Sequence, residues 1–146
     1  MTISEDLQGR GLRATPFREE LLSLLRAEGL PLSHQEIQGR FREKVDRVTL
    51  YRNLELLRTH GLVHQVQGLD GAWRFCAHDV SGPGCPGNHV HLLCVVCGRM
   101  ECLVDQPLPR VAVHEGFEVE GKQLVVYGCC SGCREKKTSQ GEDGTC

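Results

Sequence analysis

The sequence contains no long hydrophobic run. No stretch of about eighteen apolar residues occurs, and the first residues, MTISEDLQGR, hold no apolar core of the kind found in secretory signals. We therefore expect neither a transmembrane helix nor a signal peptide, and no membrane partner. The predicted location is the cytoplasm, where thiols stay reduced and can hold a metal ion.

The chain also lacks a strong excess of positive charge. Its formal net charge is -2, which gives no general attraction for nucleic acid. Residues 1–64 carry ten Lys or Arg against nine Asp or Glu, a net charge of +1, whereas residues 65–146 carry seven against ten, a net charge of -3. Any binding of DNA must therefore depend on a few well-placed arginines in the first half.

No His-Glu-x-x-His motif or comparable pairing occurs. Catalytic zinc requires an open coordination position and a positioned general base, so we expect no zinc hydrolase, no other enzyme and no small-molecule substrate. The sequence instead has nine cysteines and seven histidines, more than packing requires. Because an odd number of cysteines argues against a closed disulfide framework, metal ligation is the better explanation.

The first half predicts three short helices. The first begins at an N-cap followed by proline and carries a leucine stripe, the second begins with a capping box, and the third presents leucines at i, i+4 and i+7. Such a series predicts a helix-turn-helix core. The residues that carry these signals are Thr15, Pro16, Leu21, Leu22, Leu24, Leu25 and Gly29, then Ser33, Glu36, Ile37 and Phe41, and finally Val48, Leu50, Leu54, Leu57 and Gly61.

Directly after Gly61 the pattern changes from helical to extended. The segments LVHQVQG and AWRFCA flank Leu69, Asp70 and Gly71, and Asp-Gly is a favourable hairpin turn. This hairpin is interpreted as the wing of a winged helix. The following segment, DVSGPGCPGN at residues 79–88, contains three glycines and two prolines and is predicted to be a loop between two halves.

The second half predicts a small α/β domain. The segment HVHLLCVVCGRMECLV is typical of strand, zinc knuckle and strand, and it is followed by an amphipathic helix from Leu108 to His114 and by the strands FEVEG and QLVVYG. The predicted fold class is α+β. The predicted domains are a winged-helix DNA-binding domain at 1–78, a hinge loop at 79–88, a metal-binding dimerisation domain at 89–134 and a disordered tail at 135–146.

Two Cys-x2-Cys motifs give the strongest single signal. Each motif can turn two thiolates toward one ion, and four thiolates satisfy the preference of zinc for a closed tetrahedral site. A structural zinc site can supply about 10–16 kcal/mol of folding free energy, more than a half-domain of this size otherwise gathers. The alternative is a redox dithiol or a set of buried cysteines. The predicted structural zinc ligands are Cys94, Cys97, Cys130 and Cys133.

A second set of soft ligands lies on both sides of the hinge loop. His89 and His91 alternate along a strand, which places both imidazoles on one face, and Cys76 ends the second wing strand. A metal ion that joined them would fix the angle between the halves. The mixture of thiols and imidazoles favours zinc over Fe(II) or Mn(II). The predicted regulatory ligands are His64, Cys76, His89 and His91, with Cys102 as the rival to His64 and with His78 and Cys85 as further substitutes.

The third helix, from Arg47 to His60, is the predicted recognition helix. Its exposed face carries Thr49, Tyr51 and Arg52, with Asn53 as a further candidate, near the helix N-terminus where such helices meet base edges. Arginine can bind guanine bidentately, and Tyr and Thr can meet a thymine methyl or phosphate oxygens. Before the Thr15 cap, Arg10 and Arg13 are placed to reach phosphates or a minor groove. The alternative is that the arginines only solvate a helix face.

With these motifs in place, the chain resembles the ferric uptake regulator (Fur) family, and within it the zinc uptake regulator branch. The resemblance covers roughly residues 8–135 and depends on the combination of GLRATPFREELLSLL, VTLYRNLELLRTHGLV, HVHLLCVVCG and YGCCSGC. In the iron regulators a glutamate follows Arg-Phe, whereas this chain has Cys76 there, as in the zinc branch.

The resemblance implies a homodimer that binds palindromic operator DNA when loaded with metal. It implies structural zinc on the two Cys-x2-Cys motifs and a sensory zinc on Cys76, His89 and His91, completed by His64 in one arrangement and by Cys102 in another. We therefore expect two zinc ions per monomer and a repressor of zinc homeostasis genes. The alternatives are a family member that senses manganese or iron, or a thiol redox sensor that uses Cys129, Cys130 and Cys133.

Overall fold

The computed structural model of the chain describes residues 2–77 and 89–139. The chain divides into two compact units, Met1–Gly87 and Asn88–Cys146. This division falls at the end of the predicted hinge loop, whose residues lie outside the described ranges together with His78 and Cys85. Within the described ranges, every helix falls short of the length and apolar content needed to cross a membrane.

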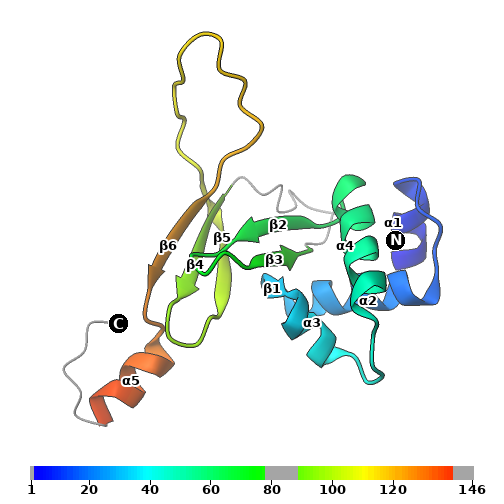
Figure 1. The fold of residues 1–146 in the computed structure, drawn as a ribbon, viewed down its shortest axis with the longest axis horizontal. Helices are drawn as coiled ribbons and strands as arrows, with labels where there is room; N and C mark the ends of the chain where they lie inside the picture. Colours follow the sequence, from blue (N-terminus) through cyan, green and yellow to red (C-terminus); the bar gives the residue numbers. More distant parts are fainter. Residues whose placement is uncertain (1, 78–88, 140–146) are drawn as a thin grey trace. The chain divides into compact units, whose positions relative to one another are not determined.

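The first unit is a winged helix, as predicted. Its helices are α1 (Ile3–Gly9), α2 (Pro16–Glu28), α3 (His34–Arg40) and α4 (Arg47–Thr59). Its strands β1 (Leu32–Ser33), β2 (His64–Gln67) and β3 (Trp73–Cys76) form an antiparallel sheet in the order β1-β3-β2 (Figure 1). The strands β2 and β3 are the predicted wing hairpin, while α1 and β1 were not predicted.

Local signals account for the ends of these helices. The Thr15 hydroxyl accepts a hydrogen bond from the backbone N–H of Arg18, and Pro16 occupies the first helical position. Helix α2 ends at Gly29, whose φ of 63° lies in the left-handed region that glycine adopts at little cost. Ser33 and Glu36 form the predicted capping box at the start of α3. Contacts between residues a few positions apart therefore fix both ends of α2 and the start of α3.

The core of the first unit is built largely of leucines from the helices, closed on one side by the sheet. Leu50, Leu54 and Leu57 of α4 are fully buried, so the opposite face of that helix is left for solvent or a partner. The remaining core residues are Leu7, Leu12, Leu21, Leu22, Leu25, Leu32, Ile37, Leu62, Val63, Phe75 and Ala77.

The second unit is a three-stranded sheet followed by a short helix. The strands are β4 (His89–Cys94), β5 (Met100–Pro107) and β6 (Leu124–Gly128), in the order β5-β4-β6, and the helix is α5 (Ser131–Ser139). The central strand β4 pairs antiparallel with β5 and parallel with β6. Because two parallel neighbours run in the same direction, the ends of β4 and β6 lie at the same edge of the sheet.

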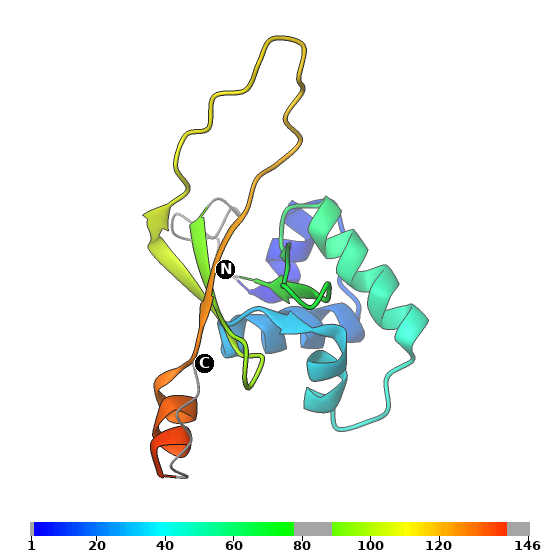
Figure 2. The same cartoon turned by 60° about the vertical axis from the view of Figure 1, so that its left-hand side comes forward.

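The segment between β5 and β6 differs from the prediction. The helix predicted from Leu108 to His114 and the strand FEVEG are wrong, since residues 108–123 form neither helix nor strand and extend from the sheet as a long excursion (Figure 2). Prolines 107 and 109 disfavour helical geometry in the residues before them. Val111, Val113 and Phe117 are exposed, so a short amphipathic helix has no apolar surface to pack on.

The predicted tail at 135–146 is also partly wrong. Helix α5 continues to Ser139, and residues 140–146 lie outside the described ranges. The helix starts within the second Cys-x2-Cys motif, and its first turn is closed by the hydrogen bond from Arg134 N–H to the Cys130 carbonyl. Arg, Glu and Lys are good helix formers, and they extend the turn that the motif begins.

Candidate metal centres and recognition helix

The two Cys-x2-Cys motifs meet at one edge of the second unit. Cys94 ends β4, Cys130 follows the end of β6, and Cys94 is in register with Gly128 across the parallel pair. The parallel pairing therefore brings together two motifs that are far apart in the sequence. We call Cys94, Cys97, Cys130 and Cys133 the four-thiol cluster.

The sulfur positions fit a tetrahedral zinc ion. All four Sγ atoms lie within 4.8 Å of one another, and the Cys94–Cys133 and Cys97–Cys130 sulfur pairs are 3.8 Å and 3.9 Å apart. Zinc–sulfur bonds of about 2.3 Å in a tetrahedron place sulfurs about 3.8 Å from one another. The cluster is thus already close to the shape that a structural zinc ion requires.

Backbone donors make the cluster electrostatically uneven. The N–H groups of Cys97 and Cys130 donate to Cys94 Sγ at 3.5 Å and 3.4 Å, and these hydrogen bonds lower the pKa of Cys94 to about 6. In contrast, the neighbouring Cys130 sulfur, together with burial, raises the pKa of Cys133 to about 12. Cys94 therefore loses its proton readily, whereas deprotonation of Cys133 is opposed by the neighbouring sulfurs. A bound divalent cation would remove this opposition because it stabilises all four thiolates.

A second group of ligand atoms lies on the face of the β4–β5 pair. His89 and His91 share a face of β4, as their alternation predicted, with ring centroids 4.5 Å apart. Cys102 of β5 is the direct cross-strand neighbour of His91. The ligand atoms of these three residues lie within 4.8 Å of one another, so they can share one ion after small rotations of their side chains.

In the first unit, His64 and Cys76 are directly opposite each other on β2 and β3. Cys76 is fully buried and His64 is half-buried. The predicted regulatory ligands therefore fall into two pairs, one on each unit, and Cys102 joins the pair on the second unit. Cross-strand pairing places Cys76 beside His64, although the two residues are twelve positions apart in the sequence.

The other histidines of the described ranges have structural contacts. His60 is the C-cap of α4, and its Nδ1 lies 2.8 Å from the Leu56 carbonyl. His114 packs edge-on against Phe117. His34 contacts Tyr51, a residue of α4, which sequence reasoning missed because the two residues lie on different helices.

The recognition helix α4 starts at Arg47, as predicted, and ends at Thr59, one residue before the predicted end. Its N-cap is Asp46, whose carboxylate accepts hydrogen bonds from the backbone N–H and the hydroxyl of Thr49 at 3.0 Å and 3.1 Å. Tyr51 and Arg52 are exposed, as is Arg13 before α2. The amide of Asn53 donates to the Thr49 carbonyl and accepts from Arg18, so this side chain is held within the unit.

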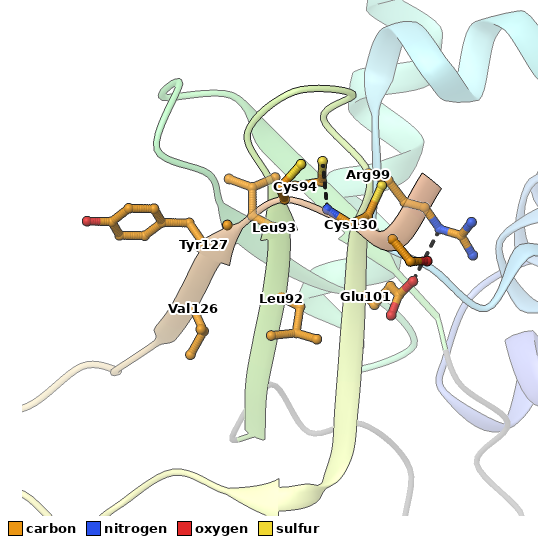
Figure 3. Close-up of a pocket in the computed structure, with 11 residues that line it drawn as sticks. Leu92, Leu93, Cys94, Arg99, Glu101, Val126, Tyr127 and Cys130 are labelled. Atoms are coloured by element: carbon orange, nitrogen blue, oxygen red, sulfur yellow. Dashed lines mark hydrogen bonds and ion pairs between the residues drawn. The ribbon is translucent and has the colours of Figure 1, made fainter. Parts of the chain in front are cut away.

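A pocket of about 340 Å³ opens on the second unit beside the four-thiol cluster (Figure 3). Leu92 of β4 and Val126 of β6 are neighbours in register on its floor. Val126 and Tyr127 remain 48% and 63% exposed. Because successive side chains of a strand point to opposite faces, the edge strand β6 leaves large apolar side chains exposed on both faces of the sheet.

Comparison with known proteins identifies the family of the chain. The model of the ferric uptake regulator family matches residues 9–127. The ferric uptake regulation protein of Synechocystis is 30% identical, over 88% of this chain and 81% of that protein. The chain belongs to the ferric uptake regulator family. The peroxide operon regulator of Bacillus subtilis is similar at 29% identity, over 91% of this chain and 92% of that protein.

Solved structures of the Fur family share the fold. The holo form of XcZur is 29% identical, with a TM-score of 0.58 over 88% of this chain and 91% of that chain. A zinc uptake regulator in complex with zinc and DNA gives a TM-score of 0.67 at 23% identity, over 92% of each chain. Fur-family proteins are metal-responsive transcriptional regulators that bind operator DNA as dimers, and they are not enzymes.

Proposed function

We propose that this Fur-family protein is a zinc-responsive repressor that controls zinc homeostasis genes. The observation that carries the proposal is the softness of the second ligand group. His89, His91 and Cys102 bring imidazole and thiol donors within 4.8 Å of one another, and Cys76 offers a further thiol from the first unit. Zinc accepts such mixed ligands, whereas Fe(II) and Mn(II) favour carboxylates.

The proposed site takes ligands from both units. In this arrangement Cys76, His89 and His91 bind one exchangeable zinc ion, completed by His64 or by Cys102. When bound, the ion supplies a bridge between the wing strands and β4. The four-thiol cluster holds a second, structural zinc ion, which gives two zinc ions per monomer.

Repression follows from linkage between zinc and DNA. Zinc that binds a closed arrangement of the units better than an open one shifts the population toward the closed arrangement. In a dimer this sets the spacing of two recognition helices, which meet successive major grooves about one helical turn apart. By reciprocity, a palindromic operator tightens the binding of zinc. Such a regulator works on the chromosome and therefore in the cytoplasm.

The proposed DNA contacts are made by the first unit. Tyr51 and Arg52 stand on the exposed face of α4 and read base edges, with the Thr49 methyl beside them, while Arg13 binds a phosphate or a minor groove. The Thr49 hydroxyl proton is already donated to Asp46, so Thr49 is left with its methyl group and an acceptor oxygen for DNA.

Metal content and two matched substitutions test the proposal. We expect two zinc ions per monomer by elemental analysis, one of which a mild chelator removes. Cys76→Ala should retain the structural zinc and a folded dimer but lose zinc-dependent binding to a duplex selected by the wild-type protein from a random pool. Cys97→Ala should instead lose the tightly bound zinc and destabilise the second unit. An unchanged zinc response in Cys76→Ala would contradict the proposed site.

The fourth ligand and the metal are decided by two further measurements. Comparison of His64→Ala with Cys102→Ala identifies which residue completes the site, since only the true ligand should lower zinc affinity strongly. A member of the family that senses manganese or iron is the second candidate, favoured by the similarity to the ferric and peroxide regulators. Binding of the protein to the selected duplex, measured as a function of zinc, manganese or Fe(II) concentration, separates these candidates.

A further inference from the structure

A contact between α3 and α4 ties down one exposed side chain of the recognition helix. His34, the first residue of α3, places its Nδ1 atom 3.0 Å from the Tyr51 hydroxyl. The two rings lie against each other with centroids 5.0 Å apart. On the same helix, the guanidinium of Arg47 lies over the Tyr51 ring at 5.6 Å from its centroid.

These contacts remove freedom from a side chain that is otherwise on the surface. Tyr51 is 39% exposed, and an exposed tyrosine explores several rotamers. A hydrogen bond from another helix and a cation over the ring select one orientation before any ligand arrives. Preorganisation of this kind raises affinity because less conformational entropy is lost on binding.

The charge state of His34 suits this role. Burial, together with the positive charge of Arg47, lowers the pKa of His34, so the imidazole is neutral at pH 7. A neutral imidazole whose proton is on Nε2 accepts the Tyr51 hydroxyl proton at Nδ1. The tyrosine oxygen then presents lone pairs, and the ring presents an apolar edge, at the surface of α4.

We propose that His34 is a positioning residue for DNA recognition: it holds Tyr51 in the orientation in which the recognition helix meets base edges. The inference rests on the proposed role of α4 in reading DNA. His34 acts through Tyr51, and two other polar side chains at this end of α4 are fixed differently. Thr49 is held by the Asp46 cap and Asn53 by Arg18, both independently of His34.

A double-mutant cycle on the zinc-loaded full chain tests this role. Affinities for a duplex selected by the wild-type protein, and for an unrelated duplex of equal length, are measured by fluorescence anisotropy at saturating zinc. His34→Ala should weaken binding to the selected duplex by about 3- to 10-fold, the size of one hydrogen bond, and leave the unrelated duplex unchanged. His34→Asn should restore most of the affinity because its Oδ1 takes the place of Nδ1 as acceptor.

Tyrosine 51 supplies the second arm of the cycle. In a Tyr51→Phe background, His34→Ala should have a much smaller effect on affinity, since the hydroxyl that His34 holds is gone and only the ring contact remains. An equal loss in both backgrounds would show that His34 contacts DNA by itself and would overturn the proposal. So would unchanged affinity in His34→Ala. Zinc content and thermal unfolding of each variant exclude a general loss of folding.

A measurement without DNA separates this inference from the proposed function. The nitrogen-15 resonance of His34 Nδ1 should shift between the wild-type protein and Tyr51→Phe, because the hydrogen bond exists in the free protein. If the wild-type protein enriches no duplex in the presence of zinc, the proposed function fails while this resonance still reports the contact. An unshifted resonance overturns the positioning role whatever the DNA experiments show.

Discussion

One ion pair closes the wing, and its members differ sharply in exposure. The side chain of Arg74 is 5% exposed and that of Asp70 is 55% exposed, and two N–O contacts of 3.2 Å join them. The Asp70 carboxylate also accepts the backbone N–H of Ala72 at 3.1 Å. The hydrogen bonds from Arg74, followed by the one from Ala72, lower the pKa of Asp70. The ionised form of this residue is therefore the one that stabilises the hairpin.

The effect of Asp70 on stability should depend on pH. Because the pKa of Asp70 in the folded protein lies below the ordinary aspartate value of 3.8, its contribution is complete above that value and is lost as the pH falls through the folded pKa. We expect Asp70→Asn to lower the unfolding free energy by about 0.5–1 kcal/mol at pH 7, a figure reduced for solvent screening. The difference from wild type should vanish in strong acid.

Urea unfolding can follow this change through Trp73, the single tryptophan of the chain, which lies in the wing. Glu55→Gln is the matched control because the Glu55–Arg58 pair is exposed on both sides. It should change stability little at any pH. A pH-independent loss in Asp70→Asn would show that the Arg74 ion pair does not stabilise the wing.

Among the elements, α4 shows how an N-cap can be missed when a helix is predicted from its apolar spacing. The predicted start of the helix at Arg47 is correct, but the apolar spacing of its leucines did not identify Asp46 as the N-cap. The carboxylate satisfies two donors of Thr49, and its negative charge faces the positive end of the helix dipole. The cap therefore fixes the turn that carries the proposed DNA-reading residues.

Asp46→Ala should destabilise the protein by about 1 kcal/mol, the usual cost of a lost N-cap. It should also loosen the first turn of α4. Relative to the wild type, amide hydrogen exchange should therefore accelerate more at Thr49 than at Leu57. Asp46→Ser retains a capping oxygen and should preserve both properties. Equal exchange rates in the alanine variant and the wild type would mean that packing alone holds this end of the helix.

For the whole molecule, the exposed apolar side chains of the second unit need an explanation. Large apolar side chains remain exposed on β6 and on the excursion before it, and large exposed apolar areas are typical of interaction sites. Dimerisation in the Fur family gives a reason for this exposure. The exposed residues of this region are Val111, Val113, Phe117, Val119, Leu124, Val126 and Tyr127.

Val126→Asp should convert the proposed dimer to monomer, because a carboxylate at a buried interface loses its hydration without gaining a partner. Light scattering after size exclusion measures the change, and zinc content checks that the four-thiol cluster is intact. Leu69→Asp is the control, an equally drastic change at an exposed apolar residue of the wing turn. A Val126→Asp protein that stays dimeric would place the interface elsewhere.

The sequence by itself determined what depends on near neighbours. Helix starts at Thr15 and Ser33, the wing turn at Asp70 and the chemistry of the two Cys-x2-Cys motifs all follow from residues a few positions apart, whose contacts are set by local backbone geometry. Local pattern failed between residues 108 and 123, where an apolar spacing had no surface in the chain to pack against.

Only the tertiary structure decided which distant residues meet. The parallel β4–β6 register brings the Cys130 N–H to the Cys94 sulfur, strand pairing sets Cys102 opposite His91, and helix packing sets His34 against Tyr51. Each contact joins segments that would lie apart in other arrangements of the same strands and helices. The spacing of residues along the chain indicates which side chains can bind a metal ion, whereas long-range packing determines which of them lie together.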